Sequence, residues 1–346
     1  MGVTINDVAA LAGVSRATAA RVLAGYGYVS EEARQKVYEA ARQLGYRPHS
    51  IAQSMVTGRT KTIGLVVGDI ENPFFAKMAR GVSDTIIHEG YNLIVCSTNE
   101  NPIDERSAID GLCRKKVDGL IIAPASRREH SHIDELIEHK FPVVLVDRVL
   151  DVAGVDMIAV TNVEGAFDAV KHLLERGYRE IAFLSDSFEI SSNVERFEGY
   201  KRALAEKGLP IREDYIRTGS YTVEAGYREA VSLLSGTVRP EAVFAANNFM
   251  TIGVLRAAKD MHIAIPGQLA LVGFDEMDWL ELVSPTITAI AQPVYELGQV
   301  AAQRLLRRIA GDMTRPEVIR LSTRLIPRES SGVNPVRTEE EIDEVR

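Results

Sequence analysis

The pattern of apolar and polar residues changes character near residue 61. Before that point, apolar residues recur at helical spacing in three short stretches, and each stretch follows a hydroxyl residue that can cap a helix: Thr4, Ser15 or Ser30. Two short helices joined by a turn that contains Gly13, with a third helix beside them, are typical of a helix-turn-helix unit. A small helical cap without a special role fits the same pattern.

The second stretch, which runs from residue 16 to residue 24, has the chemistry of a helix that reads DNA. An arginine can donate two hydrogen bonds to guanine, and an alanine can contact a thymine methyl group. The residues expected to face bases are therefore Arg16, Ala17, Thr18 and Arg21. Phosphate contacts that set the register would come from Thr4, Ser15, Tyr28 and Ser30, although Tyr28 could equally be a packing residue.

A short stretch between Pro48 and Gly58 has too little apolar area to fold alone. Such a segment could form a hinge helix that orders only against a partner helix and DNA. We then expect Ala52 and Met55 to contact DNA, with Met55 as an apolar wedge in the minor groove. An ordinary flexible linker is the alternative.

From Thr62 onward, short apolar strands alternate with amphipathic helices, which predicts parallel sheets with crossover helices. Two sets of strands predict two doubly wound lobes. The first set is 62–67, 92–96, 119–123 and 143–147, and the second is 158–160, 181–185, 215–219, 243–246 and 269–273.

Polar and aromatic residues collect where these strands end. Ligands of open α/β sheets bind beyond the carboxyl ends of the strands, and a polyhydroxylated ligand needs paired donors and acceptors beside an apolar surface. Each residue alone could instead cap the following helix. The candidates are Asp69, Asn72, Phe74, Phe75, Asp147, Arg148, Tyr221, Asn247 and Asp275.

Composition separates the same two regions. The chain has 346 residues and a net charge of −8, which alone argues against a nucleic-acid partner. Residues 1–61, however, hold eight basic and four acidic residues, so this segment is positive and the remainder is strongly negative. Chance variation over 61 residues is the alternative explanation.

Other features of the sequence bear on where the protein is located in the cell and on whether it is an enzyme. No apolar run reaches the length of a membrane span, and residues 1–20 do not resemble a secretory signal, so a cytoplasmic protein is expected. Cys96 and Cys113 form no metal-ligand or disulfide pattern. No phosphate-binding loop, dinucleotide fingerprint or nucleophile elbow is present, so neither an enzyme nor a cofactor is expected. A sugar-binding or sugar-processing protein with the same core is the rival interpretation.

The chain contains five distinctive motifs: Val3-Thr4-Ile5-Asn6-Asp7-Val8-Ala9, Ala12-Gly13-Val14-Ser15, Leu44-Gly45-Tyr46-Arg47-Pro48, Asn72-Pro73-Phe74-Phe75 and Val272-Gly273-Phe274-Asp275. Together they resemble the lac repressor (LacI/GalR) family of bacterial transcription regulators. The resemblance implies a core like a type 1 periplasmic binding protein, whose cleft holds a small effector. It adds Gln292 to the ligand-binding candidates. Two positions depart from the family: Val194 replaces an arginine that grips the ligand, and Asn248 replaces an aspartate.

The resulting hypothesis is an α/β protein with a helix-turn-helix domain and a two-lobed core of doubly wound parallel sheets. The expected domains are 1–48 for DNA binding, 49–61 for the hinge helix and linker, 62–330 for the core, and an acidic tail at 331–346. Lobe 1 is expected at about 62–150 and 289–315, and lobe 2 at about 158–280 and 318–330. The chain would cross between the lobes near 147–161, 275–288 and 311–321.

The expected function is an effector-responsive regulator, most simply a repressor. It would bind a palindromic operator in double-stranded DNA as a homodimer. The family's effector site has lost one cation and one anion here, which favours a neutral sugar or polyol as the effector. A nucleoside is the alternative. No metal, no cofactor and no membrane partner is expected.

Overall fold

The computed structural model describes residues 3–24, 27–46, 58–236 and 238–332. The chain divides into two compact units. The first consists of residues 1–62 together with 115–118, and the second of residues 63–114 together with 119–346. We refer to them as the head unit and the core unit. The expected hinge helix, with Ala52 and Met55, and residues 333–346 of the expected acidic tail lie outside the described residues. The expected start of the tail at residue 331 is wrong, because Ser331 is buried and ends the 3-10 turn Glu329–Ser331.

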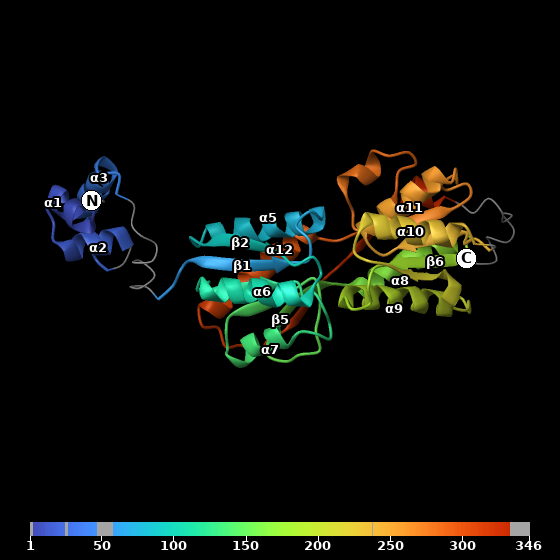
Figure 1. The fold of residues 1–346 in the computed structure, drawn as a ribbon, viewed down its shortest axis with the longest axis horizontal. Helices are drawn as coiled ribbons and strands as arrows, with labels where there is room; N and C mark the ends of the chain where they lie inside the picture. The colour runs from blue at the N-terminus through green and yellow to red at the C-terminus, as the bar shows by residue number, and fades with distance from the viewer. Residues whose placement is uncertain (1–2, 25–26, 47–57, 237, 333–346) are drawn as a thin grey trace. The chain divides into compact units, whose positions relative to one another are not determined.

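The head unit contains three helices, which are α1 (Ile5–Ala12), α2 (Arg16–Ala24) and α3 (Glu31–Gln43) (Figure 1). The Asp7 carboxylate begins α1 by accepting the Thr4 N–H at 2.8 Å. Gly13 ends this helix in the left-handed region, at φ 65°, which glycine adopts without a steric penalty. Buried Ala19 and Val37 contribute to one small apolar core. The helix-turn-helix expectation is thereby confirmed.

The end of the linker is tied to a turn that follows α6 (Pro102–Arg114). The Thr60 and Lys61 backbone N–H groups donate to the two carboxylate oxygens of Asp118, at 2.8 and 3.0 Å. The Thr60 hydroxyl donates to the Lys116 carbonyl at 2.7 Å. These bonds explain why residues 115–118 belong to the head unit.

Two six-stranded sheets form the core unit. The first has the strand order β11-β5-β4-β3-β1-β2 and the second has the order β12-β10-β9-β8-β6-β7. The strands of the first sheet are β1 (Thr62–Val67), β2 (Asn92–Ser97), β3 (Gly119–Ile122), β4 (Val143–Val146), β5 (Asp156–Val160) and β11 (Val318–Leu321). The strands of the second are β6 (Ile181–Ser185), β7 (Ile216–Thr218), β8 (Ala242–Ala245), β9 (Ala270–Phe274), β10 (Thr288–Ala291) and β12 (Arg324–Ile326). β12 runs antiparallel to β10.

Helices accompany each sheet and complete two lobes (Figure 1). Lobe 1 contains the first sheet with α5 (Pro73–Ile87), α6, α7 (Ser131–Glu138) and α12 (Val294–Ile309). Lobe 2 contains the second sheet with α8 (Asn162–Glu175), α9 (Ser191–Glu206), α10 (Val223–Leu234) and α11 (Asn248–Asp260). Short 3-10 turns occur at Glu213–Tyr215, Asp278–Glu281 and Glu329–Ser331. The expected fold class is confirmed.

Close helix packing explains one pair of glycines. A Cβ at Gly81 of α5 would lie 2.1 Å from the Tyr295 carbonyl oxygen, and a Cβ at Gly298 of α12 would lie 2.2 Å from the Met78 carbonyl oxygen. Both contacts are shorter than van der Waals packing allows. Only glycine at these positions therefore lets the two helices lie against each other and against the first sheet.

The lobe boundaries expected from the sequence are wrong in three places. β5 pairs with β4, and β11 pairs with β5, so both belong to lobe 1, whereas β10 pairs with β9 in lobe 2. The chain therefore crosses at residue 161, at residues 292–293 and at residues 322–323. Short apolar strands look alike in sequence, and which sheet each joins depends on long-range pairing that the pattern does not encode.

No helix among the residues that the structure describes combines the length and the apolar character that crossing a membrane requires.

Candidate functional site

The candidate DNA-reading residues of the head unit lie on an exposed surface. Arg16, Ala17 and Arg21 of α2 are all exposed, and Thr18 is half-buried. The side chain of Tyr28 is 95% exposed, so within the head unit it is not a packing residue. The guanidinium in the first turn of α2, that of Arg16, is therefore accessible to a partner molecule.

The remaining candidates for phosphate contact begin helices. The Ser15 hydroxyl accepts the Thr18 N–H at 3.0 Å and also hydrogen bonds with the Thr18 hydroxyl at 2.9 Å. The Ser30 hydroxyl accepts the Ala33 N–H at 3.3 Å. Thr4 bonds to Asp7, as described above. These residues therefore cap helices, whether or not they also contact DNA.

A small cavity lies within the core unit and is lined by residues from both lobes. It brings together nine of the ten candidate ligand-binding residues, namely Asn72, Phe74, Phe75, Asp147, Arg148, Tyr221, Asn247, Asp275 and Gln292. Asp69 is not part of the lining, because its carboxylate instead accepts the Glu71 N–H at 2.8 Å in the loop after β1. The lining also includes five residues that the sequence did not single out, namely Asp186, Ile190, Ser192, Asn193 and Arg196.

The ends of parallel strands place the carboxylates of this cavity. Asp147 directly follows β4, and Asp275 directly follows β9; both have left-handed backbones, at φ 68° and 78°. Asp186 follows β6 in the same way, so the rule that selected the other two would have found it. Asn193 and Asn247 each donate an amide hydrogen to the Asp186 carboxylate. Parallel strand ends thus converge three carboxyl groups on one cavity.

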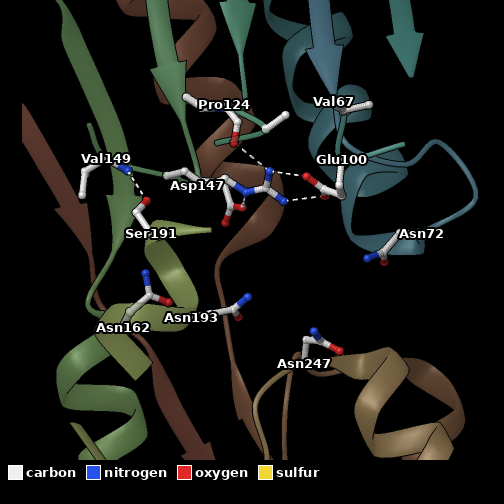
Figure 2. Close-up of polar contacts among 12 residues, drawn as sticks. Val67, Asn72, Glu100, Pro124, Asp147, Val149, Asn162, Ser191, Asn193 and Asn247 are labelled. Carbon is white, nitrogen blue, oxygen red and sulfur yellow. Dashed lines mark hydrogen bonds and ion pairs between the residues drawn. The ribbon is translucent and has the colours of Figure 1, made fainter. Parts of the chain in front are cut away.

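Arg148 is held rigidly at one side of the cavity. Its two terminal nitrogens donate to the two carboxylate oxygens of Glu100, both at 2.6 Å, and one of them also donates to the Pro124 carbonyl at 2.8 Å (Figure 2). Burial disfavours the guanidinium charge, but attraction and hydrogen bonds from Glu100 outweigh it and raise the pKa of Arg148. A Cβ at Gly68 would overlap the Glu100 carboxylate, so a side chain there would displace this pair.

Arg196 is the most informative residue that the sequence reasoning missed. Its guanidinium lies 3.8 Å from the centre of the Phe274 ring, donates to the Asn162 amide oxygen at 2.9 Å and donates to the Ala246 carbonyl at 2.7 Å. The family resemblance indicates Val194 instead, two residues earlier in the sequence. The helical spacing of Ser192, Asn193 and Arg196 along α9 places all three toward the cavity, and this spacing could have identified them.

A series of polar contacts connects Arg196, through Asn162 and Glu195, to lobe 1. The Asn162 amide nitrogen donates to Glu195 at 2.9 Å, and Glu195 pairs with Arg320 of β11 at 2.5 Å. Arg320 belongs to lobe 1, whereas Asn162 and Glu195 belong to lobe 2. Beside it, the Thr323 N–H donates to the Thr161 hydroxyl at 3.0 Å, which joins two of the crossing segments. The position of Arg196 is therefore linked to the crossings between the lobes.

The cavity is rich in carboxyl groups and in hydrogen-bond acceptors. Burial raises the pKa of Asp147 to about 6 and that of Asp186 to about 7, against the opposing effect of Arg148 and Arg196. Burial also raises the pKa of Asp275, against the opposing effect of Arg196. Among the described residues that line the cavity, two buried acceptors, Asp147 Oδ1 and Gln292 Oε1, and one buried donor, Arg148 Nε, have no hydrogen-bond partner. Buried acceptors are costly when they are unpaired, so this arrangement favours a ligand that supplies hydrogen-bond donors.

A wider cavity adjoins the first. It has a volume of about 430 Å³ and shares Asp186, Ile190 and Tyr221 with the inner cavity. Small hydroxyl residues contribute to its walls, namely Ser126, Ser187, Ser220 and Thr222. The two cavities together offer space for a ligand that is longer than the inner cavity alone can hold.

The described residues contain no group of three or more His, Cys, Asp or Glu side chains that could hold a metal ion. The side chains that line the inner cavity are carboxylates, amides, guanidinia, hydroxyls and aromatic rings. This set is suited to recognising a polar organic ligand by hydrogen bonds and stacking.

Comparison with known proteins gives consistent matches for both units. The family described as bacterial regulatory proteins, lacI family, matches residues 4–49, and a periplasmic binding protein-like domain matches residues 170–331. Catabolite control protein A of Priestia megaterium is 35% identical over 96% of this chain and 100% of its own length. The HTH-type transcriptional repressor PurR of Vibrio cholerae is 33% identical over 94% of this chain and 97% of its own.

A solved structure of a transcriptional regulator, CelR, in complex with cellobiose is also similar. It is 31% identical, covers 95% of this chain and 99% of its own, and has a TM-score of 0.72. These similarities extend over nearly the whole chain, so they include the helices of the head unit and both lobes of the core.

Proposed function

Since the chain belongs to the lacI family of bacterial regulatory proteins and is a transcriptional regulator, we propose that it represses its target by binding a palindromic operator as a homodimer. We further propose that a neutral sugar or polyol in the cavity between the lobes controls its affinity for DNA. The observation that carries this proposal is the presence, in one chain, of exposed arginines on α2 and a buried, acceptor-rich cavity.

The proposed DNA contacts follow from chemistry and exposure. Arg16 would donate to guanine, Ala17 would contact a thymine methyl group, and Arg21 would act one helical turn further on. Ser15, Thr18, Tyr28, Ser30 and Thr4 would hold the backbone phosphates. Such a head domain binds DNA with strong dependence on salt, because bound phosphates release counterions.

The proposed effector class follows from the charges of the inner cavity. Asp147, Asp186 and Asp275 line it, Arg148 is already neutralised by Glu100, and Arg196 is the remaining lining cation. A phosphorylated or carboxylated ligand would face this excess of carboxylates, whereas the hydroxyl groups of a neutral sugar can donate to them. Phe74 and Phe75 supply an aromatic wall.

The joined cavities also bear on ligand size. A relative of similar fold has been solved with the disaccharide cellobiose. In this chain a second sugar unit would lie in the wider cavity, beside the serines and Thr222. We therefore expect a disaccharide or a glycoside to bind more tightly than the corresponding single sugar.

The DNA-binding proposal is tested by selecting bound sequences from fragmented genomic DNA with the full-length protein. We expect an enriched palindromic site that is bound tightly and in a salt-sensitive manner. Arg16→Ala should relax the preference at one base pair of each half-site, and Arg42→Ala, an exposed arginine of α3, should not. A selection that returns no common sequence would contradict the proposal.

The effector proposal is tested by thermal unfolding of the full-length protein with neutral sugars, polyols, nucleosides and sugar phosphates, each at the same concentration. A specific ligand raises the apparent unfolding temperature by mass action. We expect a neutral sugar or polyol to do so, and sugar phosphates to have no effect. Stabilisation by sugar phosphates alone would rule out the proposed class.

A further inference from the structure

The side-chain amides of Asn72 and Asn248 connect the two lobes directly. Asn72 precedes α5 in lobe 1, and Asn248 is the first residue of α11 in lobe 2. The Asn248 amide nitrogen donates to the Asn72 amide oxygen at 2.8 Å, and the Asn72 amide nitrogen donates to the hydroxyl of Tyr221, also in lobe 2. Each asparagine is only 2% exposed. Both ends of the Asn72 amide are therefore bonded to the opposite lobe.

Backbone donors fix the orientation of both amides. The Asn72 oxygen also accepts the Phe74 N–H at 3.0 Å, and the Asn248 oxygen accepts the Phe249 N–H at 2.8 Å. Rotating either amide by half a turn would place its NH2 group against a backbone N–H, which would leave buried donors unpaired. Asn72 is thus the acceptor and Asn248 the donor of the bond between the lobes.

This polarity gives the two positions different requirements. A carboxylate at position 248 would still accept the Phe249 N–H, but its second oxygen would face the Asn72 oxygen, and two acceptors repel. It would also lie near Asp275, whose carboxylate accepts the Asn248 N–H at 3.2 Å. A carboxylate at position 72 meets only donors, because it would accept from Phe74, from Asn248 and from the Tyr221 hydroxyl.

We propose that Asn72 and Asn248 are positioning residues that hold the lobes closed at this side of the cleft, and that this contact requires a hydrogen-bond donor at position 248. Other contacts between the lobes lie elsewhere along the cleft, from Arg127, Arg128 and Val149 to Phe188, Glu189 and Ser191. Both polar atoms of the Asn72 amide already take part in hydrogen bonds within the protein. Ligand recognition therefore depends on the other residues of the cavity. A protein that is already closed binds its ligand without the cost of closing, since the apparent affinity scales with the fraction of the competent form. This last consequence rests on the proposed function, whereas the closure itself does not.

The test compares isosteric changes at the two partner positions in the full-length protein. Spin labels would be placed at cysteines introduced for the exposed residues Asp104 in lobe 1 and Arg228 in lobe 2, after Cys96 and Cys113 are changed to serine. Labelled protein would be diluted into unlabelled protein, and the distance between the labels measured without ligand or DNA. The variants are Asn248→Asp, Asn248→Leu and Asn72→Asp.

We expect both Asn248 variants to lengthen and broaden the distance distribution, because Leu removes the donor without adding a charge. Asn72→Asp should keep the distribution of the parent protein although its charge change equals that of Asn248→Asp. Unchanged distances in the Asn248 variants, or opening in Asn72→Asp as large as in Asn248→Asp, would overturn the proposal. Circular dichroism of each variant shows whether it is folded. Operator selection with the parent protein tests the proposed function separately, so the two can fail independently.

Discussion

Arg148 and Glu100 meet in a two-pronged ion pair, with both bonds at 2.6 Å, and their side chains are only 4% and 9% exposed. The pair joins the end of β4 to the loop after β2 within lobe 1. Its importance for stability comes from what remains when one partner is removed, because an unpaired buried charge is far more costly than a buried pair is favourable.

Glu100→Gln should therefore destabilise the core strongly. The change leaves the buried Arg148 charge with one weaker acidic partner, the Asp147 carboxylate at 3.4 Å from its Nε, and breaking a buried pair typically costs about 3–5 kcal/mol. Chemical denaturation followed by circular dichroism would measure the loss. Glu138→Gln, an exposed glutamate at the end of α7, is the matched control and should change the free energy of unfolding by roughly 0.5 kcal/mol or less. Equal effects of the two changes would contradict the role given to the pair.

Arg196→Met should weaken effector binding while leaving the operator preference unchanged. Methionine keeps contact with the Phe274 ring but loses the hydrogen bonds to Asn162 and to Ala246, and it removes a cation that faces three carboxylates. We expect at least about a tenfold loss of affinity for a sugar identified by the thermal screen, which corresponds to roughly 1.4 kcal/mol. Arg202→Met, on the same helix but exposed, should bind that sugar like the parent protein. Unaltered binding by the Arg196 variant would remove this residue from the site.

Asp147→Asn should change how stability depends on pH. Burial raises the pKa of Asp147 from 3.8 to about 6, so the folded protein holds this proton more tightly than the unfolded chain does. The resulting stabilisation is complete below about pH 4 and is lost as the pH rises through 6. Asparagine imitates the protonated form and tolerates the left-handed backbone of this position.

The asparagine variant should thus exceed the parent protein in unfolding free energy at pH 8 by on the order of 1–3 kcal/mol. The difference should shrink toward pH 4, and denaturation curves at several pH values would show it. Asp151→Asn, an exposed carboxylate a few residues later, should leave the pH dependence unchanged. A gap of constant size across this range would show that the proton on Asp147 is not responsible.

Ser15→Ala should destabilise the head unit by removing the cap of α2, at a cost of about 1 kcal/mol. Ser15→Asp should restore the cap, since a carboxylate can accept the Thr18 N–H, but its negative charge should weaken binding to DNA. Thermal unfolding and operator titration distinguish the two effects. If Ser15→Asp bound the operator as tightly as the parent protein, Ser15 would have no place near a phosphate.

The sequence predicted the elements of this fold better than it predicted their assembly. β1 and β6 begin and end at the expected residues, because a buried parallel strand is a continuous apolar run bounded by polar residues. β5, β10 and β11 were assigned to the wrong lobe. Nothing in a run such as Asp156–Val160 says which of two similar sheets it will join, because that choice depends on register with a distant strand.

The residues of the cavity were likewise predicted only in part from the sequence. Residues at the ends of strands were found because strand ends converge in an open sheet, and Asp147 and Asp275 both line the cavity. Arg196 was missed because it lies on a helix, where its direction depends on how α9 packs on the second sheet. Asn72 was expected to bind a ligand, yet its amide is engaged by Asn248 and Tyr221, a contact between residues far apart in sequence.

The way the chain crosses between the sheets has a consequence for synthesis on the ribosome. Lobe 1 begins with β1 but is completed only by α12 and by β11, which ends at Leu321. Most of lobe 2, from α8 to β10, is continuous in sequence, and its sheet lacks only the edge strand β12 when Ala291 has been made. Domains assemble as their residues emerge. The lobe whose first strand is translated earlier is therefore the one whose core stays incomplete longer, until α12 supplies Leu297, Ala301 and Leu305.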